Sequence, residues 1–176
     1  MTGERHAELE AIVAPFVYRK YLDYGTLAAM RELHAEVRAE VARRELADHV
    51  KLGPGGIREI EFIAQAFQLI RGGREAELRV RPTLAVLKLL AQKGVLSVAA
   101  ERELADAYDF LRRVEHRLQY LDDAQTHSLP EDDEDRERVA SAMGFRDWGA
   151  FRRVEDRKST RLNSSHTDIS RMPSSA

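Results

Sequence analysis

Cysteine is absent from the 176 residues of the sequence. This absence excludes disulfide bonds and metal sites built from thiolates. No apolar run approaches the roughly 20 residues that a membrane-spanning helix needs. Residues 1–10 are polar and lack the features of a signal peptide. We therefore expect a cytoplasmic protein without a membrane partner.

An excess of positive charge is also missing. The chain has 28 Lys and Arg residues against 30 Asp and Glu residues, for a net charge of −2. Surfaces that bind nucleic acids are dominated by basic residues, so we expect no nucleic acid partner.

Strand-like alternation of apolar and polar residues is almost absent. Residues 77–82 are the one short candidate, and they are too few to build a sheet. Apolar residues recur instead at spacings of three and four, which predicts an all-α fold, a helical bundle. The expected helices cover residues 26–44 and 57–71, Pro82 to Gly94, Ser97 to a loop at 123–130, Asp132 or Asp133 to Gly144, and one or two turns within 147–154.

The segment KLGPGGIREIEFIAQ (residues 51–65) places three glycines and a proline directly before a helix. A glycine-rich turn that opens a helix can present free backbone N–H groups to a phosphate. Lys51 and Arg58 could add positive charge to such a site. The spacing matches neither a Walker loop nor a dinucleotide-binding fingerprint. A plain helix-opening turn therefore stays open as the alternative.

Two narrow polar stripes interrupt otherwise apolar helices. The first follows the glycines and consists of Arg58, Glu61, Gln65 and Gln68. The second lies on the long helix near residue 115 and consists of Arg112, Glu115, His116 and Gln119. Because buried polar groups need partners, we expect the two stripes to face and satisfy each other. They could be internal pairs or the polar wall of a site.

Two other groups could bind a metal ion. His116 and His127 could do so with Glu115 or Asp123, but no ligand spacing repeats, so structural histidines are favoured. Asp133 and Asp135 have a spacing suited to Mg²⁺. They stand at the start of an expected helix, where acidic residues interact favourably with the helix dipole. We therefore predict no metal site in this chain.

Residues 156–176 are polar, rich in serine and without periodicity. They resemble a translated sequencing adapter, which reads in frame as residues 156–166 and, further along, as residues 170–176. We expect a disordered tail unrelated to the fold, with the natural protein continuing beyond this point. A natural disordered terminus is the alternative.

Several segments together carry a resemblance to a known family. KLGPGGIREIEFIAQAFQLIRGG (residues 51–73) and FLRRVEHRLQYLDDAQTHSLP (110–130) strongly resemble the glutamine synthetase adenylyltransferase/adenylyl-removing enzymes. PFVYRKYLDYG (15–25) and MGFRDW (143–148) agree, so the similarity extends to about residue 154. The motifs look more like the N-terminal half, which resembles an adenylyl removase that uses phosphate and releases ADP.

The resemblance implies a domain organisation. Residues 1–50 would be the end of a nucleotidyltransferase domain and a linking helix, residues 51–155 a helical domain, and residues 156–176 the tail. The family's paired aspartates, which bind Mg²⁺, have no counterpart here, so the catalytic residues are unknown. We expect Mg²⁺ and ATP or ADP in the intact enzyme, none of them held by this chain alone, which should be inactive.

The resemblance also implies site residues and partners. The family's glycine motif borders the nucleotide cleft and falls on Lys51, Gly53, Gly55, Gly56, Arg58, Glu59 and Glu61. The expected partners are glutamine synthetase and a PII signalling protein. The alternative is a non-catalytic helical module that docks one of these two proteins.

Overall fold

The computed structural model describes residues 2–19, 24–44, 46–122 and 127–170. This part of the chain is all-α, as the sequence predicts, and contains no strand beyond an isolated bridge between His49 and Ser128. The elements are α1 (Thr2–Val17), α2 (Tyr24–Arg43), α3 (Ile57–Arg71), the 3₁₀ helix η1 (Ala76–Leu78), α4 (Thr83–Gln92), α5 (Val98–Asp122), α6 (Asp133–Ala142) and α7 (Trp148–Ser170).

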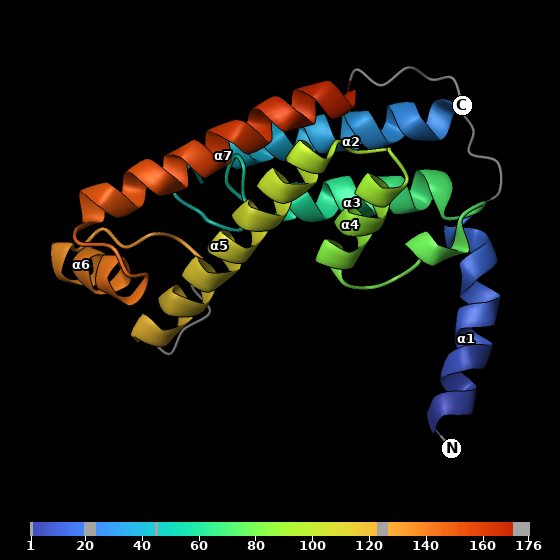
Figure 1. The fold of residues 1–176 in the computed structure, drawn as a ribbon, viewed down its shortest axis with the longest axis horizontal. Coiled ribbons are helices and arrows are strands. Elements are labelled where there is room, and N and C mark those ends of the chain that lie inside the picture. Colours follow the sequence, from blue (N-terminus) through green and yellow to red (C-terminus); the bar gives the residue numbers. More distant parts are fainter. Residues whose placement is uncertain (1, 20–23, 45, 123–126, 171–176) are drawn as a thin grey trace.

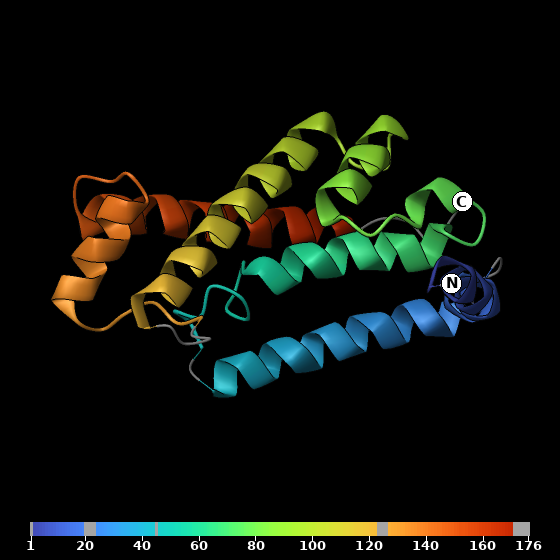
Figure 2. The same ribbon diagram turned by 90° about the horizontal axis from the view of Figure 1, so that it is seen from below.

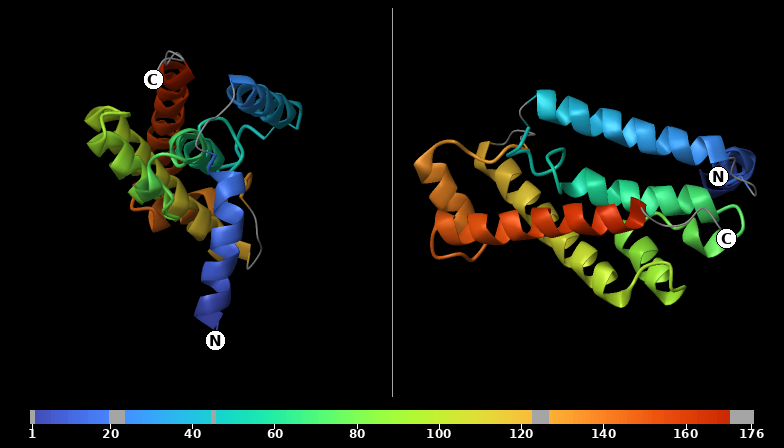
Figure 3. Two further views of the ribbon diagram at one scale, coloured as in Figure 1. Left: turned by 90° about the vertical axis from the view of Figure 1, so that its right-hand side faces the viewer. Right: turned by 90° about the horizontal axis from the view of Figure 1, so that it is seen from above.

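Helix α5 organises the bundle. It is 25 residues long, packs against α3, α4, α6 and α7, and crosses α3 and α7 diagonally (Figures 1 and 2). Helix α2 runs alongside α3, whereas α1 projects away from the other helices (Figures 2 and 3). The loop between α2 and α3 carries the glycines, so α5 and this loop together frame the start of α3.

The core is formed by one face of each packed helix. Its fully buried side chains include Ile57 and Ile60 of α3, and Leu87 and Leu90 of α4. Helix α5 contributes buried residues at helical spacing, namely Leu104, Ala107, Leu111, Val114 and Leu118. This apolar stripe leaves the neighbouring polar edge of α5 facing the glycine loop.

Four aromatic rings join α5 to the start of α7. Phe151 of α7 is fully buried, and its ring centroid lies 4.9 Å from that of Trp148 and 5.9 Å from that of Phe110. Phe145 meets Phe151 edge-to-face at 5.7 Å. Such offset and edge-to-face pairs add to the stabilisation from burial. The cluster therefore fixes α7 against α5.

The ends of α6 follow the sequence signals. The carboxylate of Asp132 accepts hydrogen bonds from the amides of Glu134 and Asp135, at 2.9 and 3.2 Å. Asp132 is therefore the N-cap, and Asp133 and Asp135 pair with arginines of the same helix. Gly144 follows the helix with φ of 81°, a left-handed conformation that favours glycine.

Three segments differ from the prediction. Helix α1 was not predicted from the sequence, although its apolar residues have helical spacing. Residues 76–78 form η1, a 3₁₀ helix that the sequence did not predict. Helix α7 continues to Ser170, where one or two turns and then a disordered tail were expected. The reason is local, because no glycine or proline stands between Gly149 and Pro173 to end a helix. Residues 171–176 lie outside the described residues.

Among the described residues, no helix combines the length and the apolar character required to cross a membrane.

The aromatic cluster gives the first testable prediction. Phe151→Ala should lower the free energy of unfolding by about 3–5 kcal/mol, because it leaves a cavity among buried rings. Urea denaturation followed by circular dichroism measures this. Tyr120 is 80% exposed, so Tyr120→Ala should change the same quantity by about 0.5 kcal/mol or less. Equal effects of the two substitutions would contradict the assigned core.

Candidate functional site

The glycine loop folds back on itself through its own backbone. The amide of Gly53 donates to the His49 carbonyl at 2.6 Å, and the amide of Gly56 donates to the Gly53 carbonyl at 2.9 Å. The first amides of α3 are also used, since Ile57 donates to Val50 and Arg58 donates to Lys51, at 3.1 and 3.0 Å. These bonds satisfy the donors that a helix start normally leaves free.

Glu59 uses the remaining glycine amide. Its carboxylate accepts a hydrogen bond from the Gly55 amide at 3.1 Å, and it lies 3.6 Å from the Arg38 guanidinium of α2. The Glu59 side chain is therefore buried inside the loop. The expectation that these glycines present free N–H groups to a phosphate is wrong, because the loop's amides already have partners.

The glycines are required by the tightness of the turn. Gly55 has φ of 70°, and a Cβ on Gly56 would lie 2.8 Å from the carbonyl oxygens of both Gly53 and Lys51. A Cβ on Gly53 would lie 2.6 Å from the His49 carbonyl oxygen. The chain's own backbone thus occupies the space that a side chain would need.

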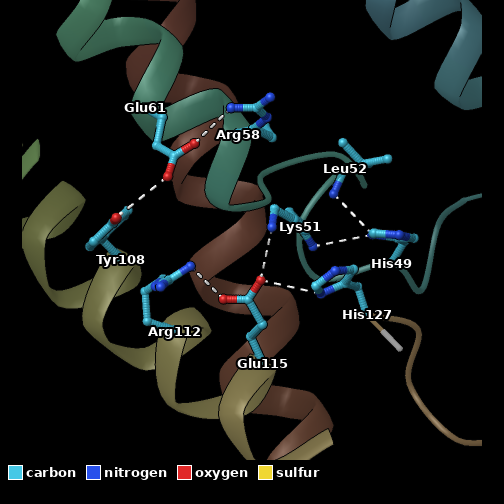
Figure 4. Close-up of polar contacts among 9 residues, drawn as sticks. All are labelled: His49, Lys51, Leu52, Arg58, Glu61, Tyr108, Arg112, Glu115 and His127. Atoms are coloured by element: carbon cyan, nitrogen blue, oxygen red, sulfur yellow. Dashed lines mark hydrogen bonds and ion pairs between the residues drawn. The ribbon is translucent and has the colours of Figure 1, made fainter. Parts of the chain in front are cut away.

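His49 fixes the start of the loop. Its Nδ1 accepts hydrogen bonds from the amides of Lys51 and Leu52, at 3.3 and 3.0 Å (Figure 4). The imidazole lies beside that of His127, with ring centroids 5.5 Å apart. Desolvation, and secondly the charge of His127, lower the pKa of His49. The neutral form is favoured, and only that form can accept both bonds at Nδ1.

Glu115 links the loop to α5. Its carboxylate is almost completely buried and lies 3.3 Å from the Lys51 ammonium and 2.5 Å from an Arg112 nitrogen (Figure 4). The Nδ1 atom of His127 is 3.2 Å away, although it is not aligned for a hydrogen bond. Three side chains from three segments thus surround one buried carboxylate.

The first polar stripe reaches α5 through a different residue. Arg58 and Glu61 pair on the surface of α3 at 3.2 Å. The hydroxyl of Tyr108 on α5 donates to the other oxygen of Glu61 at 3.5 Å (Figure 4). Tyr108 thus connects the first stripe to α5, and Lys51 connects the second stripe to the glycine loop. The expectation that the stripes satisfy each other directly is wrong in that respect.

Some predicted residues lie outside this cluster. His116 is exposed and Gln119 is half-buried. Gln68 donates to the carbonyls of Leu78 and Val80, both at 2.7 Å, and so holds η1. Gln65 is exposed. The predicted residues that the structure brings together are Lys51, Arg58, Glu61, Arg112 and Glu115, which we call the cationic cluster. His49 and Tyr108 contact these residues or the loop, and the sequence analysis did not identify them.

The cluster has the wrong composition for a metal ion. Its two carboxylates, Glu61 and Glu115, already contact arginine or lysine. In the part of the chain that the structure describes, no group of three or more His, Asp or Glu side chains could hold a metal ion. The available chemistry is instead cationic, since Lys51 of the loop, Arg58 in the first turn of α3 and Arg112 of α5 each pair with one of these carboxylates and remain partly exposed.

The buried carboxylate gives a prediction on stability. Glu115→Gln keeps the side-chain volume and should lower the free energy of unfolding by about 1–3 kcal/mol, because charge-assisted contacts are lost in a buried position. Lys51→Met should cost less in the Glu115→Gln background than in the wild type. The measurement is a urea-denaturation double-mutant cycle. Strictly additive effects would show that Lys51 and Glu115 do not interact.

The position of His49 gives a prediction on pH. Its folded-state pKa lies below the ordinary value of about 6.5, so the unfolded chain binds the proton more tightly. Lowering the pH below about 6.5 should therefore reduce the free energy of unfolding. In His49→Asn, which keeps an acceptor that does not titrate, this loss should be smaller. His116→Asn is the control, since His116 is exposed. If both substitutions reduced the pH dependence of the free energy of unfolding equally, His49 would not be its source.

Comparison with known proteins places this region in a family. A family model described as GlnD PII-uridylyltransferase matches residues 30–171. The bifunctional glutamine synthetase adenylyltransferase/adenylyl-removing enzyme of Aromatoleum aromaticum is 62% identical over 156 residues, which cover 89% of this chain and 17% of that protein. Its counterpart from Chromobacterium violaceum is 59% identical over 151 residues, with 86% and 17% covered.

The matches cover most of this chain but only a small part of each relative. The counterpart from Nitrosococcus oceani is 50% identical over 169 residues, which cover 92% of this chain and again 17% of the relative. The chain thus spans about one sixth of the length of the curated relatives it matches. On this similarity over nearly its whole length, the chain belongs to the family of bifunctional glutamine synthetase adenylyltransferase/adenylyl-removing enzymes.

Proposed function

We propose that this chain is part of an enzyme that attaches AMP to glutamine synthetase and removes it again. The names of the relatives support this proposal. We assign the chain to the adenylyl-removing half, because the REIEF motif and the PFVYRKYLDY lead-in look more like that half. In this half, a phosphate oxygen would attack the phosphorus of the AMP group, the bond from that phosphorus to the synthetase would break, and ADP would leave.

The proposed site rests on three partly exposed cations that pair with Glu61 and Glu115. Lys51 comes from the glycine loop, Arg58 from the first turn of α3 and Arg112 from α5. Lysine and arginine are the side chains that proteins use for phosphate, arginine with a fork of donors and lysine as a point charge. We propose that this cluster borders the nucleotide cleft and stabilises negative charge during nucleotidyl transfer.

The role of Glu115 in this proposal is positioning. A lysine on a flexible stem loses conformational entropy when it is fixed. Contact with the buried Glu115 carboxylate already restricts Lys51 before any ligand arrives. Glu61 does the same for Arg58 on the surface of α3. The two carboxylates therefore orient the three cations and offset most of their positive charge.

Mg²⁺ does not fit among the residues of this cluster, because its carboxylates are engaged by cations. We propose that the metal and the catalytic carboxylates are supplied by another part of the intact enzyme, which also binds ATP or ADP. On this proposal, residues 1–50 lead from a nucleotidyltransferase domain into the helical domain of residues 51–155. The chain alone would then be inactive.

Glutamine synthetase is the proposed protein substrate, and a PII signalling protein is the proposed regulator. A helical module that only docks these proteins is less favoured, because the relatives are named as enzymes with two activities. Because the chain has a net negative charge, a local group of cations is better explained as a site for a phosphate group than as a surface for docking a protein.

Arg58 provides the test in the intact enzyme. Arg58→Ala should reduce the rate of phosphate-dependent adenylyl removal by about tenfold or more, the worth of a charge-assisted hydrogen bond. Its thermal stability should stay close to that of the wild type, since Arg58 is 60% exposed and pairs only at the surface. Release of ADP from adenylylated glutamine synthetase is the assay.

Arg138 is a matched control for this experiment. Its side chain is 59% exposed and pairs with acidic residues three and four positions away on α6. Arg138→Ala should leave the rate of adenylyl removal unchanged. If Arg58→Ala retains the wild-type rate, the segment is only a helix-opening turn and the proposed role of the cluster is wrong.

A further inference from the structure

Helix α1 exposes an apolar stripe. Ile12 is 64% exposed and Phe16 is 74% exposed, and three more exposed apolar residues accompany them: Leu9, Val13 and Val17. At about 100° per residue, all five fall within an arc of about 140° on one side of the helix. A continuous apolar stripe of this kind marks an interaction surface.

The C-terminal end of α1 is anchored to the bundle through Tyr18. Tyr18, at the end of the helix, lies against Gly72, where a Cβ would come within 2.7 Å of the tyrosine ring. The guanidinium of Arg79 lies 5.1 Å from the centroid of the Tyr18 ring and donates to the Gly72 carbonyl at 2.6 Å. Glycine at position 72 thus allows the ring to dock.

This anchor determines where the stripe points. On the helical wheel, Tyr18 is about 180° from Leu9, at the centre of the stripe. Helix α1 projects from the bundle, and none of the other described helices runs along its side (Figures 1 and 3). The stripe is therefore held outward, away from the helices that pack around α5.

We infer that the apolar stripe of α1 is the surface on which the nucleotidyltransferase domain of the same polypeptide packs in the intact enzyme. More than four-fifths of the length of each matched relative lies outside the matched region, so a large part of the same chain is available as the occupant. The inference rests on the proposed function, which places that domain next to residues 1–50.

The sequence of α1 favours this occupant over a lipid surface. Helices that lie on membranes are rich in Lys and Arg on their polar face. Residues 2–17 contain three glutamates, one arginine and one histidine. A folded domain with an apolar patch is the better match for a stripe bordered by acidic residues.

The experiment compares hydrogen–deuterium exchange in α1 between the intact enzyme and the 176-residue chain. If the stripe is covered, the amides of α1 should exchange about tenfold or more slowly in the intact enzyme. The double substitution Ile12→Glu and Phe16→Glu should abolish that protection in the intact enzyme. It should leave the melting temperature of the 176-residue chain unchanged, because both side chains are exposed there.

Val98→Glu is the matched control, since Val98 is 57% exposed at the start of α5 and lies outside the stripe. It should leave the protection of α1 intact. Equal exchange of α1 in the two proteins would overturn the inference. Protection that grows with concentration in the 176-residue chain would also overturn it, because the occupant would then be a second copy.

The readout separates this inference from the proposed function. Exchange protection does not depend on catalysis. If α1 is protected but the intact enzyme does not release ADP from adenylylated glutamine synthetase, the docking surface stands and the proposed function fails. If the enzyme is active and α1 is unprotected, the proposed function stands and the docking surface fails.

Discussion

The buried carboxylate of Glu115 is the constraint on which the site depends. Burying a charge costs several kcal/mol unless a partner compensates it. Glu115 has partners on two sides, Arg112 on its own helix and Lys51 on the glycine loop. The loop must therefore bring Lys51 against α5, and because the loop leads directly into α3, the same contact fixes where α3 begins. The bonds from Lys51 and Leu52 to His49 then hold the loop in that position.

This arrangement decides what kind of anion site the region can form. The tight turn requires glycines, and its amides are used within the loop, so the backbone does not act as a phosphate cradle. The donors that remain belong to the side chains of Lys51, Arg58 and Arg112. Two carboxylates keep these cations in place, and a phosphate group that entered would meet positive charge arranged in advance. The same residues thus account for the fold of the loop and for its proposed role.

The helices of the bundle could be predicted because their apolar residues keep helical spacing, as in Ile57, Ile60 and Phe67. The Asp132 cap and the break at the glycines were also readable from local signals. The role of Glu59 could not be predicted from the sequence, because a carboxylate that accepts a bond from the Gly55 amide leaves the same sequence pattern as one that faces a ligand. Tyr108 and His49 were missed for a similar reason. Tyr108 contacts Glu61, which is 47 positions away in the sequence. His49 accepts a hydrogen bond from Lys51 only because of the loop conformation. Neither contact leaves a periodic pattern in the sequence.

The most direct test follows the response of the cluster to a nucleotide. The intact enzyme, labelled at the side chains of lysine and arginine and at the backbone amides of glycine, would be titrated with ADP and observed by solution NMR. We expect the side-chain signals of Lys51, Arg58 and Arg112 to shift, while the amide signals of Gly53 and Gly56 change little because their hydrogen bonds persist. Large shifts of the glycine amides without a response from the three side chains would contradict this expectation, because the loop backbone would then be the binding element.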